Sequence, residues 1–95
     1  MNNKEDKLKE KLFEALLKIE SKSEMARVMK DLCTPQEIKA LAERWQICQL
    51  LEQAELSYRA ISEQTGVSLT TITRVARFFK DEPHRGYKLL LKRTK

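Results

Sequence analysis

The sequence has few residues that break or bend a chain. It holds only two glycines and two prolines in 95 residues, and no stretch alternates apolar and polar residues as a β-strand does. No apolar run approaches the roughly 18 residues needed to span a bilayer, and the first residues, MNNKEDKLKEK, lack the apolar core of a secretory signal. These absences predict an all-α protein that acts in the cytoplasm and has no membrane partner.

Residues that bind metals or catalyse reactions are also scarce. Cys33 and Cys48 fit no metal-ligand spacing, and His84 is the single histidine, so a zinc site would lack ligands. We expect the two cysteines to be reduced and partly buried. The sequence shows no carboxylate pair framing a pocket, no nucleophile beside a base and no glycine-rich phosphate loop. It therefore predicts a protein that is not an enzyme and needs no cofactor.

Positive charge is abundant, but only in the second half of the sequence. Residues 1–55 hold ten Lys and Arg against eleven Asp and Glu, whereas residues 56–95 hold nine against three. A basic half beside a nearly neutral one indicates a surface for a polyanion next to a structural part, although a solubilising face gives the same pattern. A domain of 95 residues also has a thin core, which favours self-association.

Apolar spacing and helix-capping residues predict the order of the helices. Residues 4–20 form an amphipathic pattern, and a second helix follows the capping-box sequence of Ser21 and Glu24. A third, longer helix begins after Thr34 with Pro35 in its first turn, and its apolar residues cover much of its girth. We expect it to be the central spine. A last helix is expected within residues 86–95.

Residues 57–79 predict a helix-turn-helix. Ser57 caps a short helix over residues 58–64, Gly66 suits a tight turn with positive φ, and Ser68 caps the next helix. The apolar residues that would hold the two helices at a steep angle are Ile61, Val67, Ile72 and Val75.

The remaining residues of this segment are suited to DNA. Hydroxyls and cations bond phosphates, Arg also reads guanine, and Thr or Leu contacts a thymine methyl group. The residues predicted to face DNA are Tyr58, Arg59, Ser62, Ser68, Leu69, Thr70, Thr73 and Arg77. A helical unit that binds protein is the alternative interpretation of the same segment.

Residues 32–79 resemble the Trp-repressor family. The motifs that carry the resemblance are Thr34-Pro35-x-Glu37, Ala40-Leu41-x-x-Arg44, Leu50-Leu51, Leu56-Ser57-x-Arg59 and Thr70-Thr71-Ile72-Thr73-Arg74. Trp45-Gln46-Ile47 and the lysine-rich N-terminus are more similar to the YerC/YecD branch, which is typical of Gram-positive bacteria.

The resemblance implies a Trp-repressor-like helical bundle, formed as an intertwined homodimer with one helix-turn-helix at each end. In Trp repressor the second helix of that motif enters the major groove, and the two half-sites lie roughly 34–36 Å apart. Residues 1–95 would then form one domain. Residues 1–55 would serve mainly for dimerisation, residues 56–79 would be the helix-turn-helix, and residues 80–95 would form the C-terminal helix.

The resemblance extends only partly to the pocket that holds tryptophan in the tryptophan-regulated members. Four positions match, namely Thr34, Arg44, Thr71 and Arg74. The glycine of that pocket is replaced by Val75, and a small hydroxyl residue is replaced by Phe78. Our hypothesis is that Val75 and Phe78 fill the pocket from within. Arg44 and Arg74 would then contact phosphates or form ion pairs between subunits.

The functional expectation is a homodimeric, sequence-specific DNA-binding regulator, a repressor, that recognises double-stranded DNA without tryptophan as corepressor. Whether another small-molecule effector binds stays open. The alternative is a dimeric helical adaptor for other proteins, with little or no DNA binding.

Overall fold

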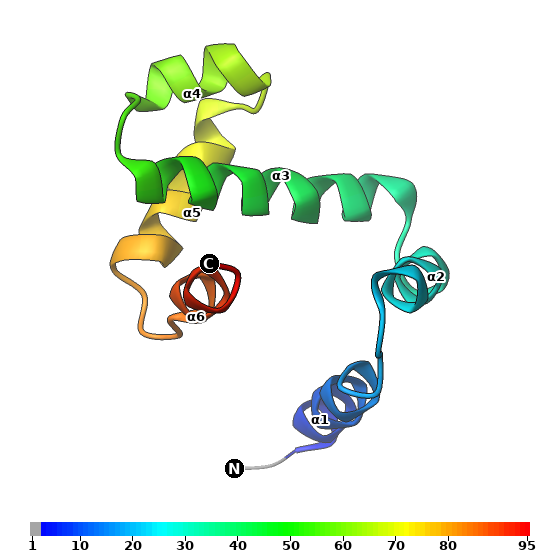
Figure 1. The fold of residues 1–95 in the computed structure, drawn as a ribbon. Coiled ribbons are helices and arrows are strands. Elements are labelled where there is room, and N and C mark those ends of the chain that lie inside the picture. Colours follow the sequence, from blue (N-terminus) through cyan, green and yellow to red (C-terminus); the bar gives the residue numbers. More distant parts are fainter. Residues whose placement is uncertain (1–2) are drawn as a thin grey trace. The chain divides into compact units, whose positions relative to one another are not determined.

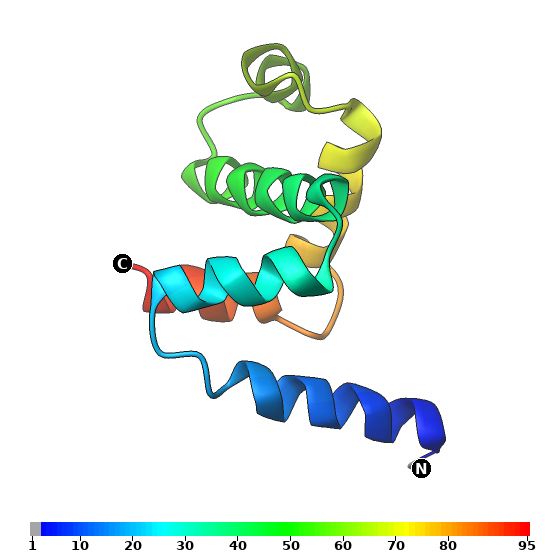
Figure 2. The ribbon, with the colours of Figure 1, turned by 90° about the vertical axis from the view of Figure 1, so that its right-hand side faces the viewer.

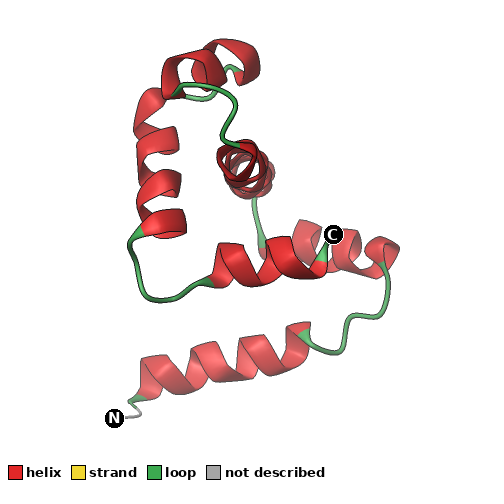
Figure 3. Cartoon of the chain, turned by 60° about the vertical axis from the view of Figure 1, so that its left-hand side comes forward, coloured by secondary structure: helices red, strands yellow, loops and turns green. Residues whose placement is uncertain are grey.

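The computed structural model describes residues 3–95, and within this range every regular element is a helix (Figure 3). In chain order the helices are α1 (Lys4–Leu16), α2 (Lys22–Leu32), α3 (Pro35–Gln53), α4 (Tyr58–Thr65), α5 (Leu69–Lys80) and α6 (Gly86–Arg93) (Figure 1). The all-α class is therefore confirmed. The chain divides into two compact units, of which the first ends at Ile38 and the second is Lys39–Lys95.

The first helix ends earlier than its apolar pattern predicts. After Leu16 the backbone forms the three-residue hydrogen bonds of a tighter turn. The amide of Lys18 donates to the Ala15 carbonyl at 3.0 Å, and that of Ile19 donates to the Leu16 carbonyl at 3.2 Å. The amide of Glu20 then donates to the Glu24 carboxylate at 2.9 Å. Glu20 thus belongs to the start of α2 and not to the end of α1.

The capping boxes at the starts of α2 and α3 differ in detail. Thr34 and Glu37 form the full reciprocal pair, in which each side chain accepts from the other residue's amide, at 3.1 and 2.8 Å. At the start of α2 the Ser21 hydroxyl accepts from the Glu24 amide at 3.1 Å, as expected. The Glu24 carboxylate, however, reaches one residue beyond the cap, to Glu20.

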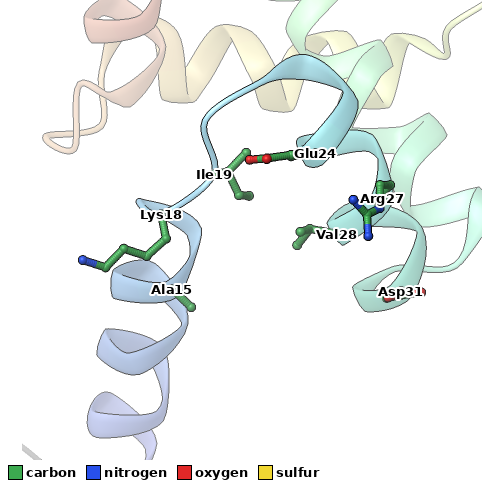
Figure 4. A pocket seen from close by; sticks show the side chains of 7 residues that line it. All are labelled: Ala15, Lys18, Ile19, Glu24, Arg27, Val28 and Asp31. Carbon is green, nitrogen blue, oxygen red and sulfur yellow. The ribbon is translucent and has the colours of Figure 1, made fainter.

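Neither α1 nor α2 buries a residue. Leu8, Phe13 and Leu17 of the first unit are exposed by 69%, 57% and 83%. The corner between the two helices leaves a hollow of about 360 Å³, which Ile19 and Val28 face (Figure 4). Its lining also contains Ala15, Lys18, Glu24, Arg27 and Asp31.

The core of the described chain lies in the second unit. Its buried residues come from the later part of α3 and from α4, α5, α6 and the turn between α4 and α5, and they are Ile47, Cys48, Leu51, Ile61, Val67, Ile72, Val75, Ala76 and Leu91. α3 therefore supplies the predicted spine only from Ile47 onward. Cys48 has no exposed surface, so it is more completely buried than the sequence predicts, and this burial raises the pKa of its thiol to about 11.

The turn after α4 depends on Gly66, whose φ of +78° is left-handed. A Cβ added there would meet no heavy atom within 4 Å, so the penalty of Gly66→Ala comes from the backbone alone. We expect a loss of about 1–2 kcal/mol in unfolding free energy. Gly86→Ala is the matched control, because Gly86 also has open space but begins α6 without a positive φ. Chemical denaturation should therefore show destabilisation for the first variant only; equal effects would contradict the strain argument.

Candidate nucleic-acid interface

α4 and α5 meet at a steep angle across a short turn, which two views turned by 90° both show (Figures 1 and 2). The four apolar residues predicted to hold them together are all buried. Ile61 and Ile72 have no exposed surface, and Val67 and Val75 retain 4% and 1%. The predicted core of the helix-turn-helix is confirmed.

Side-chain hydroxyls close the turn from within. The Thr65 hydroxyl donates to the Ile61 carbonyl at 2.7 Å and accepts from the Val67 amide at 3.1 Å. The Ser62 hydroxyl donates to the Val67 carbonyl at 2.7 Å. A serine hydroxyl has a single proton, so in this conformation Ser62 has no donor left for a phosphate oxygen. The structure thus places Ser62 as a support of the turn.

Two further residues predicted to face DNA are linked to neighbours in the chain. The Ser68 hydroxyl accepts from the Thr71 amide at 3.2 Å and donates to the Thr71 hydroxyl at 3.1 Å. The Arg77 guanidinium donates to the Glu82 carboxylate at 2.8 Å. Both side chains are exposed, but both already have polar partners.

Tyr58 has a partner that the sequence did not indicate. Its hydroxyl accepts from the Lys80 ammonium at 3.1 Å, and the same ammonium lies 5.6 Å from the centre of the Tyr58 ring. The start of α4 and the end of α5 are joined by this contact. Tyr58 and Lys80 lie 22 residues apart in the sequence, so helical spacing carries no signal for it.

Four of the eight predicted residues remain open to solvent without an internal polar partner. Arg59, Leu69, Thr70 and Thr73 are all exposed. Over residues 3–95 their side chains take part in no hydrogen bond or ion pair. One lies in the first turn of α4, and the other three lie in the first half of α5.

The residues of the predicted ligand pocket do not all come together within one unit. Arg44, Thr71, Arg74, Val75 and Phe78 belong to the second unit. Thr34 belongs to the first, where its hydroxyl caps α3. Val75 is part of the buried core, and the Arg74 guanidinium lies 4.5 Å from the centre of the Phe78 ring. An aromatic ring of the protein's own chain is therefore the neighbour of Arg74.

Tyr87 of α6 is a neighbour of the two arginines that sequence reasoning missed. Burial raises the pKa of its hydroxyl, the charge of Cys48 adds to this, and Arg44 and Arg74 oppose it. The charges of both arginines therefore act on one phenol. The sequence carries no sign of this relation, because nothing in the spacing of Tyr87 relates it to Arg44.

No helix in the described part of the chain is long and apolar enough to cross a membrane. Residues 3–95 also contain no group of three or more His, Cys, Asp or Glu side chains arranged to hold a metal ion.

Comparison with known proteins agrees with the fold. The family described as Trp repressor protein matches residues 7–95. The YerC protein of Bacillus subtilis (strain 168), itself uncharacterized, is 35% identical over 94 residues, which are 95% of this chain and 88% of YerC.

Two solved structures are similar over nearly the whole chain. A TrpR-like protein from Eubacterium eligens is 33% identical with a TM-score of 0.82, covering 90% of this chain and 86% of its own. A Staphylococcus aureus protein provisionally assigned as a Trp repressor is 31% identical with a TM-score of 0.84, covering 98% and 95%. The chain therefore belongs to the YerC-like part of the Trp-repressor family and has the all-α fold of that family.

Proposed function

We propose that the protein is a homodimeric, sequence-specific DNA-binding transcriptional regulator, a repressor, that acts through α4 and α5. The observation that carries the proposal is a group of exposed side chains without polar partners in the described chain, those of Arg59, Leu69, Thr70 and Thr73. These side chains present a cation, two hydroxyls and an apolar tip on two helices fixed by a buried core. Family membership supports the same role.

Each residue of this group suits one kind of contact with DNA. Arg59 lies in the first turn of α4, where the helix dipole also favours a phosphate. Thr70 and Thr73 lie early in α5, the part of a recognition helix that reaches base edges. Leu69 beside them suits a thymine methyl group. Arg59 would thus position the protein, and the residues of α5 would read sequence.

A second copy of the chain is the partner expected for the first unit. α1 and α2 bury nothing in a single chain, although Leu8, Leu12, Phe13 and Leu17 are large apolar residues. Covering such side chains stabilises a protein by about 25 cal/mol per Å² of apolar surface removed from water. A homodimer also supplies two reading helices for the two half-sites of a palindromic DNA site.

Tryptophan is not required in this proposal. In the tryptophan-regulated relatives that the sequence resembles, a glycine stands where this chain has Val75, which is buried. Arg74 stacks on Phe78, so its guanidinium face is already covered by an aromatic ring. Val75 and Phe78 would then hold α5 in position in place of a bound tryptophan.

Selection of genomic fragments tests the function. The purified protein, without added amino acids, should enrich a roughly palindromic sequence from a fragment pool, and its affinity should fall steeply with salt because Lys and Arg displace counterions from phosphates. Adding L-tryptophan at about 1 mM should change neither the enriched sequence nor the affinity, and calorimetry should show no saturable heat at that concentration. A low-micromolar isotherm would refute the closed pocket while leaving DNA binding intact.

The second candidate is a dimeric adaptor for other proteins, favoured by the exposed apolar side chains of α1 and α2. The fragment selection separates the two functions. An adaptor would enrich no sequence at physiological salt, and that result would end the proposal of a DNA-binding regulator.

A further inference from the structure

A second basic surface lies outside the helix-turn-helix. α6 and the turn before it line a hollow of about 440 Å³, formed by His84, Arg85, Lys88, Leu89 and Lys92. Three of these five residues are permanent cations and none is acidic. Lys88 and Lys92 are four residues apart in α6 and so lie on one face of the helix, and Arg85 directly precedes its first residue.

The charges of this hollow are not neutralised by the protein. No acidic residue follows Glu82 in the sequence, whereas Arg85, Lys88, Lys92, Arg93 and Lys95 do. Within residues 3–95 the ion pairs are Lys9–Glu5, Arg77–Glu82 and Lys95–Glu52, and none uses a cation of the hollow. Lys88 and Lys92 repel each other at this spacing, whereas Lys92 in the last turn also interacts favourably with the helix dipole.

The hollow is connected to α5 through a pair of stacked aromatic rings. The guanidinium carbons of Arg74 and Arg77 lie 4.5 and 5.8 Å from the centre of the Phe78 ring. Phe78 in turn stacks on His84, with ring centres 6.1 Å apart and planes within 14° of parallel. His84 lines the hollow. A band of cations and aromatic rings thus leads from the recognition helix to α6 within one compact unit.

We propose that this hollow binds backbone phosphates of DNA that flank the sequence read by α5. The proposal rests on the proposed function, since the DNA is the one that the helix-turn-helix holds. The ligand chemistry follows from the lining: Lys and Arg cations bind phosphate oxygens, and contacts with phosphates do not depend on the base sequence. Bound DNA carries one negative charge per roughly 1.7 Å of its axis, so phosphates that flank the site would supply anions for these cations.

The test compares a double variant, Lys88→Gln with Lys92→Gln, on two duplexes built from the fragment recovered by selection. One duplex is trimmed to its two half-sites, and the other extends by about one helical turn on each side. On the extended duplex the variant should lose affinity by on the order of tenfold at about 0.1 M salt, and its slope of log affinity against log salt should fall by about two. On the trimmed duplex its affinity should match that of the wild type within about a factor of two, because the phosphates it would contact are absent.

The matched control is Arg93→Gln with Lys95→Gln. It removes two positive charges from the same end of the chain, one of them paired with Glu52, and neither residue lines the hollow. Both double variants should keep the helical circular dichroism of the wild type, and the control should bind both duplexes almost as the wild type does.

Three results would overturn the inference. Unchanged binding of the Lys88/Lys92 variant to the extended duplex would show that the hollow does not contact DNA. The proposed function would still stand in that case, because the wild type binds the duplex. Equal losses on both duplexes, or in both double variants, would show a general effect of net charge. Failure of the wild type to bind either duplex would overturn the proposed function together with this inference.

Discussion

Replacing Ile72 by alanine is expected to lower the free energy of unfolding by about 2–5 kcal/mol. Ile72 is completely buried in α5, between α4 and the rest of the second unit, and packs in one cluster with Ile61 and Val75. The side chains around it are held on separate helices, so they can only partly fill the space that it leaves. Small domains have total stabilities of roughly 5–15 kcal/mol, so this single change removes a large share.

Thermal and chemical denaturation at one fixed protein concentration measure this effect, because association would make stability depend on concentration. Leu69→Ala is the control on the same helix, since the Leu69 side chain is 48% exposed. Its unfolding free energy should change by less than about 1 kcal/mol, while its DNA binding weakens. A small effect of Ile72→Ala would mean that α4 and α5 do not depend on this core.

Replacing Thr73 by alanine is expected to change which DNA sequence is preferred, by about 1–3 kcal/mol at the base that it reads. Thr73 is exposed, lies in the first half of α5 and has no polar partner within the described chain. Thr70→Ala should act in the same way at a neighbouring base. Arg59→Ala should instead weaken binding to all sequences by a similar factor, because a phosphate contact carries no base information.

Binding to a panel of single-base variants of the selected site separates these two effects. Ser62→Ala is a useful comparison, because its hydroxyl is already used on the Val67 carbonyl inside the turn. That variant should lower stability by about 1 kcal/mol with little change in base preference. Uniform small effects of the Thr70, Thr73 and Arg59 variants would contradict the proposed orientation of α5 on DNA.

The sequence predicts the helix-turn-helix well because its determinants are local. Ser57 and Ser68 accept from the amides three residues ahead, at 3.1 and 3.2 Å, and Gly66 takes the left-handed conformation. Capping and tight turns need only residues that are neighbours in sequence. Burial of Ile61 and Ile72 follows from their spacing on the two helices.

The details that the sequence did not predict involve side-chain rotamers or distant partners. Nothing in the spacing relates Lys80 to Tyr58, or Tyr87 to Arg44. Arg85 begins α6 in a left-handed conformation, at φ 58°, which residue type alone does not favour. In the sequence, the hollow on α6 corresponds only to a group of five cations after Glu82.

The local nature of the contacts within α4 and α5 also bears on the order in which the protein assembles. Ile61, Val67, Ile72 and Val75 lie within fifteen residues of one another, so their contacts close only short loops. Contacts of this kind form quickly, whereas those between distant segments are slow. α1 and α2 leave the ribosome first, but they have no buried residue of their own. We therefore expect α4 and α5 to fold early, whereas the apolar side chains of α1 and α2 would be covered only when the proposed dimer forms.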